Sequence, residues 1–346
     1  MSKDREFKRL VREIESLAAA ELRLQPGSTR SWLPWRRFPP ELDPARIGHE
    51  AAPGIMLWPS AGECDPGAAV SKVGGYPNAL SSEEWPRVEV PPDRQPRGPA
   101  PMSFLAQVEL APLRGLHPLA DHLPGSGALL FFLDEFHSAE GLNGDPYRRP
   151  CRVVHVDGLD RVDGVRPPPL ESRSDWSHHE IATGYYGLKP GFSADCYPAA
   201  SLRPTHGVTW RQPGFSDMEG LPYRLSEVAT RAAARVLGVE SAMGAFPHMM
   251  FGVPAAHMSR IDNLGHYPGI LDYVPGAVPD PRLDYVPPPD DPWVVLLQLS
   301  SVLIDLRSGG RQWQMQWMDV GYLGFFIRRS ALAARDWSAV VAVIDG

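Results

Sequence analysis

Five polar residues lie within or beside strongly apolar segments, and they are the side chains of this sequence that could do chemistry. They are Lys72, Gln107, His248, Gln298 and Asp319. A histidine can serve as a base or a ligand, and ammonium, amide and carboxylate groups can line a polar ligand site. If the five converge on one cleft between two halves of the protein, they predict an enzyme or a small-ligand binder.

Each of these residues also has a structural interpretation. An unpaired amide inside an apolar strand costs about 1–3 kcal/mol, so Gln107 and Gln298 must find partners, and we favour hydrogen bonds from each to loop backbone. His248 stands beside two methionines and a phenylalanine, which favours a hydrogen-bonded core histidine. Asp319 precedes a glycine turn and suits a carboxylate that caps the turn.

Several established chemistries have no motif in this sequence. Histidine spacing matches neither H-E-x-x-H nor a Cys/His finger, so we predict no metal. Gly125-Ser126-Gly127 lacks both the G-x-S-x-G elbow and the Gly-Lys-Ser/Thr ending of a P-loop. Gly74-Gly75 leads into Tyr-Pro, which blocks the helix that a dinucleotide site requires, and we predict no cofactor.

Composition narrows the class of protein further. The 346 residues carry a net charge of −7 and no run of basic residues, which argues against nucleic acid as a partner. The three cysteines fit reduced thiols, and no segment has the ~20 apolar residues of a membrane span. We therefore expect a cytoplasmic protein. The 38 prolines and 32 glycines predict short strands and many turns.

Two amphipathic helices are predicted. Apolar residues recur at helical spacing over residues 4–22, and we expect this helix to lie on its own domain rather than on a partner. A second helix is predicted over 225–237, with Ser226 as its cap and Gly238 after its end. Its arginines, at positions 224, 231 and 235, are expected to be solvated. Residues 31–60, rich in Trp and Pro, are predicted to form an irregular cover rather than a strand.

A weak internal repeat predicts the fold class. A glycine-proline turn, an apolar strand that carries a glutamine, and an apolar strand that ends in Phe-Phe occur in that order twice. The first copy of the two strands is 104–110 and 127–133, and the second is 296–299 and 321–327. We predict a β-rich α+β protein of two weakly similar halves, with largely antiparallel sheets packed together and few helices.

The same segments resemble the YwqG-like family of bacterial proteins, a domain of unknown function. The resemblance rests on Ser71 through Pro77, Met102 through Gln107, Phe131-Phe132, His248 through Pro254, Leu296 through Gln298, and Trp317 through Ile327. It implies an α+β, largely antiparallel fold and a cytoplasmic bacterial origin. The chain departs from the family pattern at Phe251 and at Ser300-Ser301, where relatives have glycine and acidic residues.

These observations predict a domain organisation and a function. An N-terminal extension is expected over residues 1–62 and the YwqG-like region over 63–346, with halves of about 63–200 and 201–346. We expect a non-catalytic binding protein whose protein partner has a basic surface, one version being an immunity-type protein that neutralises a toxin. The alternatives are the enzyme or ligand binder described above and a scaffold that dimerises through its N-terminal helix. The sequence does not predict the oligomeric state.

Overall fold

The computed structural model describes most of the chain. The described residues are 3–24, 42–60, 64–88, 100–133, 148–149, 151–159, 196–210, 222–239, 248–254, 291–305, 311–315, 317 and 321–345. The helices among them are α1 (Lys3–Leu24), α2 (Ala45–Glu50), α4 (Tyr223–Val236), α6 (Arg329–Ala334) and the short 3₁₀ turns η3 (Ala111–Leu113), η4 (Pro118–His122) and η7 (Trp337–Ala339).

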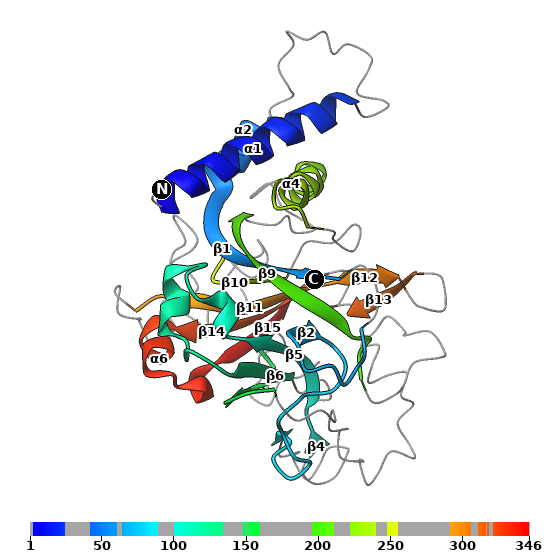
Figure 1. Cartoon of the computed structure of the whole chain (residues 1–346), viewed down its shortest axis with the longest axis vertical. Helices are drawn as coiled ribbons and strands as arrows, with labels where there is room; N and C mark the ends of the chain where they lie inside the picture. The colour runs from blue at the N-terminus through cyan, green and yellow to red at the C-terminus, as the bar shows by residue number, and fades with distance from the viewer. Residues whose placement is uncertain are drawn as a thin grey trace, which may run out of the picture.

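Strands make up the body of the molecule (Figure 1). In chain order they are β1 (Ala51–Pro59), β2 (Lys72–Val73), β3 (Arg87–Val88), β4 (Ala100–Pro101), β5 (Ser103–Glu109), β6 (Ala128–Leu133), β7 (Arg148–Arg149), β8 (Cys151–Val156), β9 (Ala200–Trp210), β10 (His248–Met250), β11 (Trp293–Ser300), β12 (Val302–Asp305), β13 (Arg311–Met315), β14 (Tyr322–Arg328) and β15 (Val341–Asp345).

Eleven of these strands form one sheet, in the order β7-β15-β14-β11-β10-β1-β9-β2-β5-β6-β8. Neighbouring strands in it are antiparallel, and two small hairpins, β3-β4 and β12-β13, lie outside it. The prediction of a β-rich, largely antiparallel protein with few helices is therefore confirmed. The strands predicted for both halves lie in this single continuous sheet.

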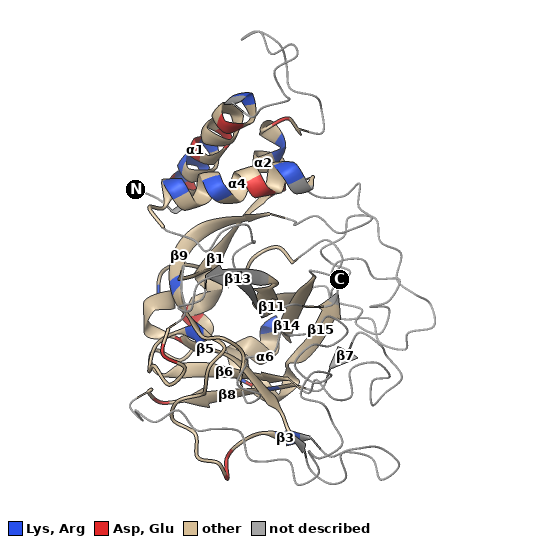
Figure 2. Cartoon of the chain, turned by 90° about the vertical axis from the view of Figure 1, so that its right-hand side faces the viewer, with Lys and Arg blue, Asp and Glu red and all other residues tan. Residues whose placement is uncertain are grey.

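The sheet curls until it is nearly closed. Its two edge strands, β7 and β8, are separated in sequence by residue 150 alone. The Cys151 thiol at the start of β8 also donates a hydrogen bond of 3.5 Å to the carbonyl oxygen of Val340, next to β15. Figure 2 shows the strands arranged around a common interior. An antiparallel sheet curled in this way leaves little free edge for another chain to pair with.

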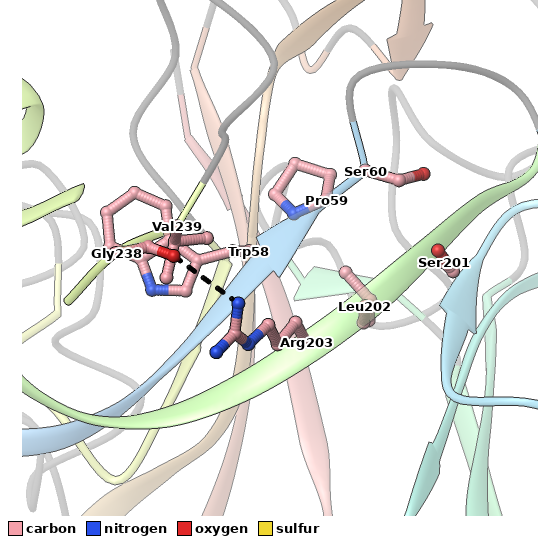
Figure 3. Close-up of a pocket in the computed structure, with 8 residues that line it drawn as sticks. All are labelled: Trp58, Pro59, Ser60, Ser201, Leu202, Arg203, Gly238 and Val239. Carbon is pink, nitrogen blue, oxygen red and sulfur yellow. Dashed lines mark hydrogen bonds between the residues drawn. The ribbon is translucent and has the colours of Figure 1, made fainter. Parts of the chain in front are cut away.

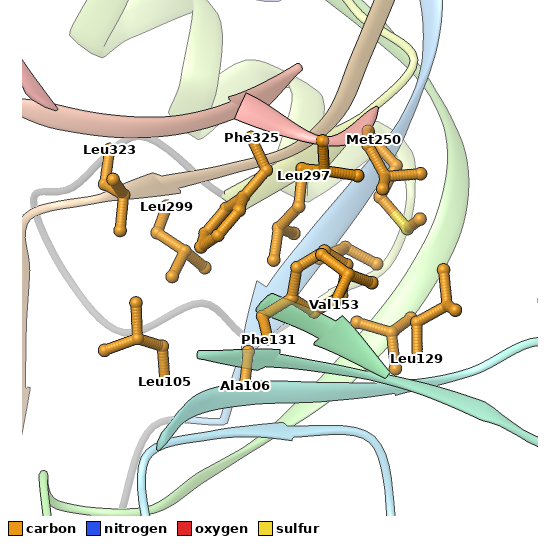
Figure 4. Packing of buried hydrophobic residues seen from close by; sticks show 14 of the residues in the cluster. Leu105, Ala106, Leu129, Phe131, Val153, Met250, Leu297, Leu299, Leu323 and Phe325 are labelled. Atoms are coloured by element: carbon orange, nitrogen blue, oxygen red, sulfur yellow. The ribbon is translucent and has the colours of Figure 1, made fainter. Parts of the chain in front are cut away.

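The interior of the curled sheet is apolar. Leu105, Phe131, Leu299 and Phe325 point into it from different strands (Figure 4), and the rings of Phe131 and Phe325 meet edge to face at 5.1 Å. We call the face of the sheet that carries this cluster the inner face and the opposite one the outer face. Alternation along each strand then fixes the face of neighbouring residues, except at the register shifts between Phe104 and Ala106 and between Val295 and Leu297.

A helical layer covers the outer face of β1 and β9 (Figure 1). The apolar stripe of α1 packs against α4 and against Met56, Trp58, Val208 and Trp210. Four of the α4 residues in this contact are small or β-branched, so the two helices can approach closely; they are Val228, Ala229, Ala232 and Ala233. The prediction that the N-terminal helix lies on its own domain is confirmed, and the second predicted helix is present as α4.

Charged residues lie along both helices of this layer (Figure 2), and some of them pair across the two helices. Glu21 of α1 accepts a hydrogen bond from Arg231 at 2.7 Å and forms an ion pair with Arg235 at 3.0 Å, both on α4. The side chain of Glu21 is 15% exposed. Of the three arginines predicted to be solvated, Arg224 and Arg235 are exposed, and Arg231 and Arg235 also bridge the two helices.

Two local predictions are wrong. Residues 51–59, predicted as irregular cover, form β1, which lies between β9 and β10 in the sheet. Pro53 is tolerated because only β9 pairs with β1 at that position, whereas both neighbours pair over Ile55–Leu57. Ser226, predicted as the cap of the second helix, is inside α4 and accepts a hydrogen bond from Trp210, while Pro222 precedes the helix.

No helix of the described residues is long and apolar enough to cross a membrane.

Candidate functional site

Lys72 lies on the outer face of the sheet and is completely buried. It pairs with Gln107 of β5 on one side and with Ser201 of β9 on the other, while its neighbour Val73 belongs to the interior cluster. The loop that precedes β2 covers it. The ammonium donates to the carbonyl oxygens of Pro66 at 2.8 Å and Ala68 at 2.7 Å, and to Asn78 Oδ1 at 3.0 Å.

Gln107 and Asn78 complete what we call the Lys72 network, which consists of Lys72, Asn78 and Gln107. The Gln107 amide donates to Asn78 Oδ1 at 2.7 Å and to the Val70 carbonyl at 2.8 Å, and its oxygen accepts from the Asn78 backbone N–H at 3.0 Å. Asn78 in turn donates to the Gly67 carbonyl at 2.9 Å. All three side chains are fully buried. The favoured interpretation of Gln107, a tie between strand and loop, agrees with this geometry.

The turn after β2 makes the network possible. Gly74 and Gly75 have φ values of 68° and 71°, in the left-handed region that favours glycine. A Cβ at Gly74 would lie 2.1 Å from the Pro198 carbonyl oxygen, so no side chain fits there. This turn reverses the chain and brings Asn78 back over Lys72 and Gln107.

The network leaves Lys72 little capacity for chemistry. Burial lowers the pKa of Lys72 to about 8, and the nearby Asp65 carboxylate is among the groups that oppose this shift. The lysine is thus mainly an ammonium at neutral pH, without a lone pair. Its three N–H groups are all directed at oxygen acceptors. A nucleophilic role would require both deprotonation and loss of these hydrogen bonds.

His248 lies on the inner face, opposite Leu57 of β1, and is fully buried. Its Nδ1 accepts the Ser300 backbone N–H at 3.0 Å. A neutral ring that accepts at Nδ1 must carry its proton on Nε2, which has no hydrogen-bond partner among the described residues. Burial lowers the pKa of His248 to about 3, so the ring is neutral at physiological pH. The Nε2 atom has no contact with solvent, and the ring can act on no ligand in this conformation.

Gln298 lies on the outer face, between the interior residues Leu297 and Leu299, and is fully buried. It pairs with Met249 of β10 and with Gly324 of β14. Asp319 lies outside the described residues. The structure therefore brings Lys72 and Gln107 together, and it places Gln298 and His248 on opposite faces of the sheet around β10 and β11.

The sequence interpretation missed two features. Asn78 joins Lys72 to Gln107, and its only signal was its position directly after the Gly-Gly-Tyr-Pro turn. The second feature is an open hollow of about 470 Å³ above the end of β1 and the start of β9 (Figure 3). It had no signal because residues 51–59 were not predicted as a strand.

The residues that line this hollow are Trp58, Pro59, Ser60, Ser201, Leu202, Arg203, Gly238 and Val239. Arg203 is exposed and sits directly opposite Trp58 in the β1-β9 pair, and its guanidinium reaches the Gly238 carbonyl oxygen at 3.5 Å (Figure 3). A backbone hydrogen bond of 2.8 Å from Ser60 to Ser201 holds the two serines side by side.

Metal ligands do not cluster in the part of the chain that the structure describes. No group of three or more His, Cys, Asp or Glu residues is placed there so that it could hold a metal ion.

The architecture defines the protein as an antiparallel sheet protein with a nearly closed, apolar interior. The family model for a domain of unknown function (DUF1963) matches residues 71–346, and the chain belongs to this family. Strand β1 precedes the matched segment, yet it lies between two strands of that segment in the sheet. No curated protein matches the chain.

Proposed function

We propose that this protein is a non-catalytic binding protein that takes up its ligand in the hollow. The observation that carries the proposal is the hollow itself, whose volume of about 470 Å³ falls in the usual range of small-ligand sites. Its lining combines apolar side chains with one cation and two hydroxyl groups. In contrast, the buried Lys72 network and His248 hold loops and strands together.

The elements around the hollow support a binding site that is already formed before a ligand binds. Its floor consists of the paired strands β1 and β9, and Trp58 is fixed there by a hydrogen bond of 2.9 Å from its indole to Thr205. One wall follows α4, where Gly238 has a φ of 59° and ends the helix. Rigid elements of this kind keep a site open without a ligand.

Blocking the hollow tests the proposal. The probe is a set of small carboxylates, phosphates, amines and neutral aromatic compounds, measured by ligand-detected NMR on the full chain. Ser201→Trp fills the hollow, and Val70→Trp adds the same indole at an exposed position elsewhere. We expect compounds that bind the wild type to lose binding in Ser201→Trp and to keep it in Val70→Trp. Binding that survives in both variants would refute the hollow as the site.

A protein partner with a basic surface is the second candidate function, and the net charge of −7 favours it. Neutralisation of a toxin, as in an immunity-type protein, is one version of it. Affinity capture from the native organism should then return a basic protein in stoichiometric amount, released as ionic strength rises. Capture that is equally strong at high salt would contradict the electrostatic basis of this candidate.

We also propose that β2-β5-β6-β8 and β10-β11-β14-β15 derive from one duplicated unit. Three parallels support this relation. Both sets occur in the same order on either side of β1 and β9, and β5 and β11 each carry an irregularity just before their glutamine. In addition, the side chain of Ser71 accepts a hydrogen bond from the backbone N–H of Glu109, two residues after Gln107. The side chain of His248 likewise accepts one from the backbone N–H of Ser300, two residues after Gln298. An experimental structure in which the two sets fail to superpose strand on strand would refute the duplication.

A further inference from the structure

Among the described residues that line the hollow, Arg203 is the one that carries a charge, and none is a carboxylate. Arg203 is exposed and stands among apolar groups and two serines. A guanidinium has five N–H donors in a planar fork. Among the described residues, the guanidinium makes a single hydrogen bond, to the Gly238 carbonyl oxygen at 3.5 Å, the outer limit of such a bond.

The neighbouring groups fit the same chemistry. Ser201 lies two residues before Arg203 on β9, so both side chains are on the outer face, and Ser60 is held next to Ser201. Hydroxyl groups and a guanidinium together donate to the oxygens of a carboxylate or a phosphate. Pro59 and Val239 line the hollow beside them and offer apolar contact.

We infer that the hollow binds a small organic anion, with its carboxylate or phosphate group on Arg203 and the two serines and its apolar part against Pro59 and Val239. This inference rests on the proposed function, because it names the class of ligand for the same site. The shared chemistry is an anionic oxygen group, and the choice between carboxylate and phosphate is left to the test.

The test titrates the full chain with inorganic phosphate, acetate and hexanoate while the Nε–H signal of Arg203 is followed by NMR. We expect saturable shifts of this signal, with hexanoate tighter than acetate because its chain covers apolar surface. Arg203→Gln should weaken binding about tenfold or more, the loss expected for a hydrogen bond to a charged group. The control is Arg152→Gln, which removes an exposed arginine on β8 and should leave affinity unchanged.

The outcomes separate the inference from the proposed function. Neutral or cationic compounds that bind in the hollow and are unaffected by Arg203→Gln would overturn the anion assignment and leave the hollow as a binding site. Anions that bind with equal affinity to wild type and Arg203→Gln would overturn the assignment as well. Binding that Ser201→Trp does not block would overturn the site itself. If inorganic phosphate binds more tightly than acetate, the ligand is of the phosphate class. If acetate binds more tightly, the ligand is a carboxylate.

Discussion

Gln107 and Gln298 lie on strands with the same pattern of pairing, but the side chains that face the two glutamines differ in charge. Gln107 faces a buried lysine on the neighbouring strand, whereas Gln298 faces Met249. The turn after β2 begins with Gly74 at a φ of 68°, and the turn after β10 begins with Phe251 at 56°. The comparison teaches that this backbone arrangement does not depend on a charge. Lys72 therefore serves to hold the loop before β2, and the equivalent position on β10 does not need a charge.

The largest expected effect on stability comes from placing a lysine opposite Gln298, where the wild type has Met249. Met249 is 2% exposed, so Met249→Lys buries an ammonium without the three acceptors that Lys72 has. We expect a loss of about 3–5 kcal/mol in the free energy of unfolding, measured by chemical denaturation. Met249→Leu keeps the volume and should cost less than about 1.5 kcal/mol. If Met249→Lys were as stable as the wild type, the two regions would be interchangeable and the comparison would fail.

The second prediction concerns acid. The folded-state pKa of His248 lies at about 3, below its ordinary value of 6.5. Stability from the neutral buried ring is thus complete above pH 6.5 and is lost as pH falls toward 3. Between pH 6.5 and about pH 4 the loss amounts to about 3 kcal/mol.

His248→Asn is the matched variant for this measurement, because its amide oxygen can accept the Ser300 N–H but does not titrate. Denaturation curves over this pH range should show a smaller loss of stability for the variant than for the wild type. Parallel losses in the two proteins would show that His248 does not stay neutral in the fold.

The third prediction concerns the removal of Lys72 from its position opposite Gln107. Lys72→Met removes the lysine donor from the Pro66 and Ala68 carbonyls and from Asn78 Oδ1, of which Asn78 Oδ1 keeps the Gln107 amide at 2.7 Å, and it also removes a buried charge. Unpaired acceptors cost about 1–3 kcal/mol each and the relief of the charge offsets part of this, so we expect a net loss of about 2 kcal/mol. The exposed Lys8→Met should change stability by less than about 0.5 kcal/mol. A more stable Lys72→Met would indicate that the lysine is kept for a function.

The smallest expected effect is the difference in stability loss between alanine substitutions at two glycines. Gly74 and Gly238 have similar positive φ values, but a Cβ at Gly238 meets nothing within 4 Å. Gly238→Ala should cost about 1 kcal/mol for the left-handed conformation alone, and Gly74→Ala at least about 1 kcal/mol more because of the clash with Pro198. Thermal or chemical denaturation measures the difference. Equal costs would mean that the turn after β2 is not tight.

The sequence predicted those elements whose pattern is regular. The strands that carry Gln107 and Gln298 were found because apolar runs are bounded by turn residues, and α1 was found from its helical spacing. β1 was missed because Pro53, Gly54 and Pro59 contradict a central strand, and only the one-sided pairing at the prolines resolves the conflict.

The candidate site was less predictable than the fold. The two strands showed where glutamines lie but not which face each side chain occupies relative to His248. The curl of the sheet decides that His248 points inward and that Lys72 lies under its own loop. The hollow depends on the contact between the end of α4 and the β1-β9 pair, which are distant in sequence.

A crystal structure of the full chain soaked with hexanoate and with phosphate tests the account most directly. We predict electron density for the anion in the hollow, within hydrogen-bond distance of the Arg203 guanidinium. The same structure should show Lys72 Nζ bound to Pro66, Ala68 and Asn78. An anion on Lys72 or His248, with the hollow empty, would contradict the assignment of binding to the hollow and of structure to the buried polar residues.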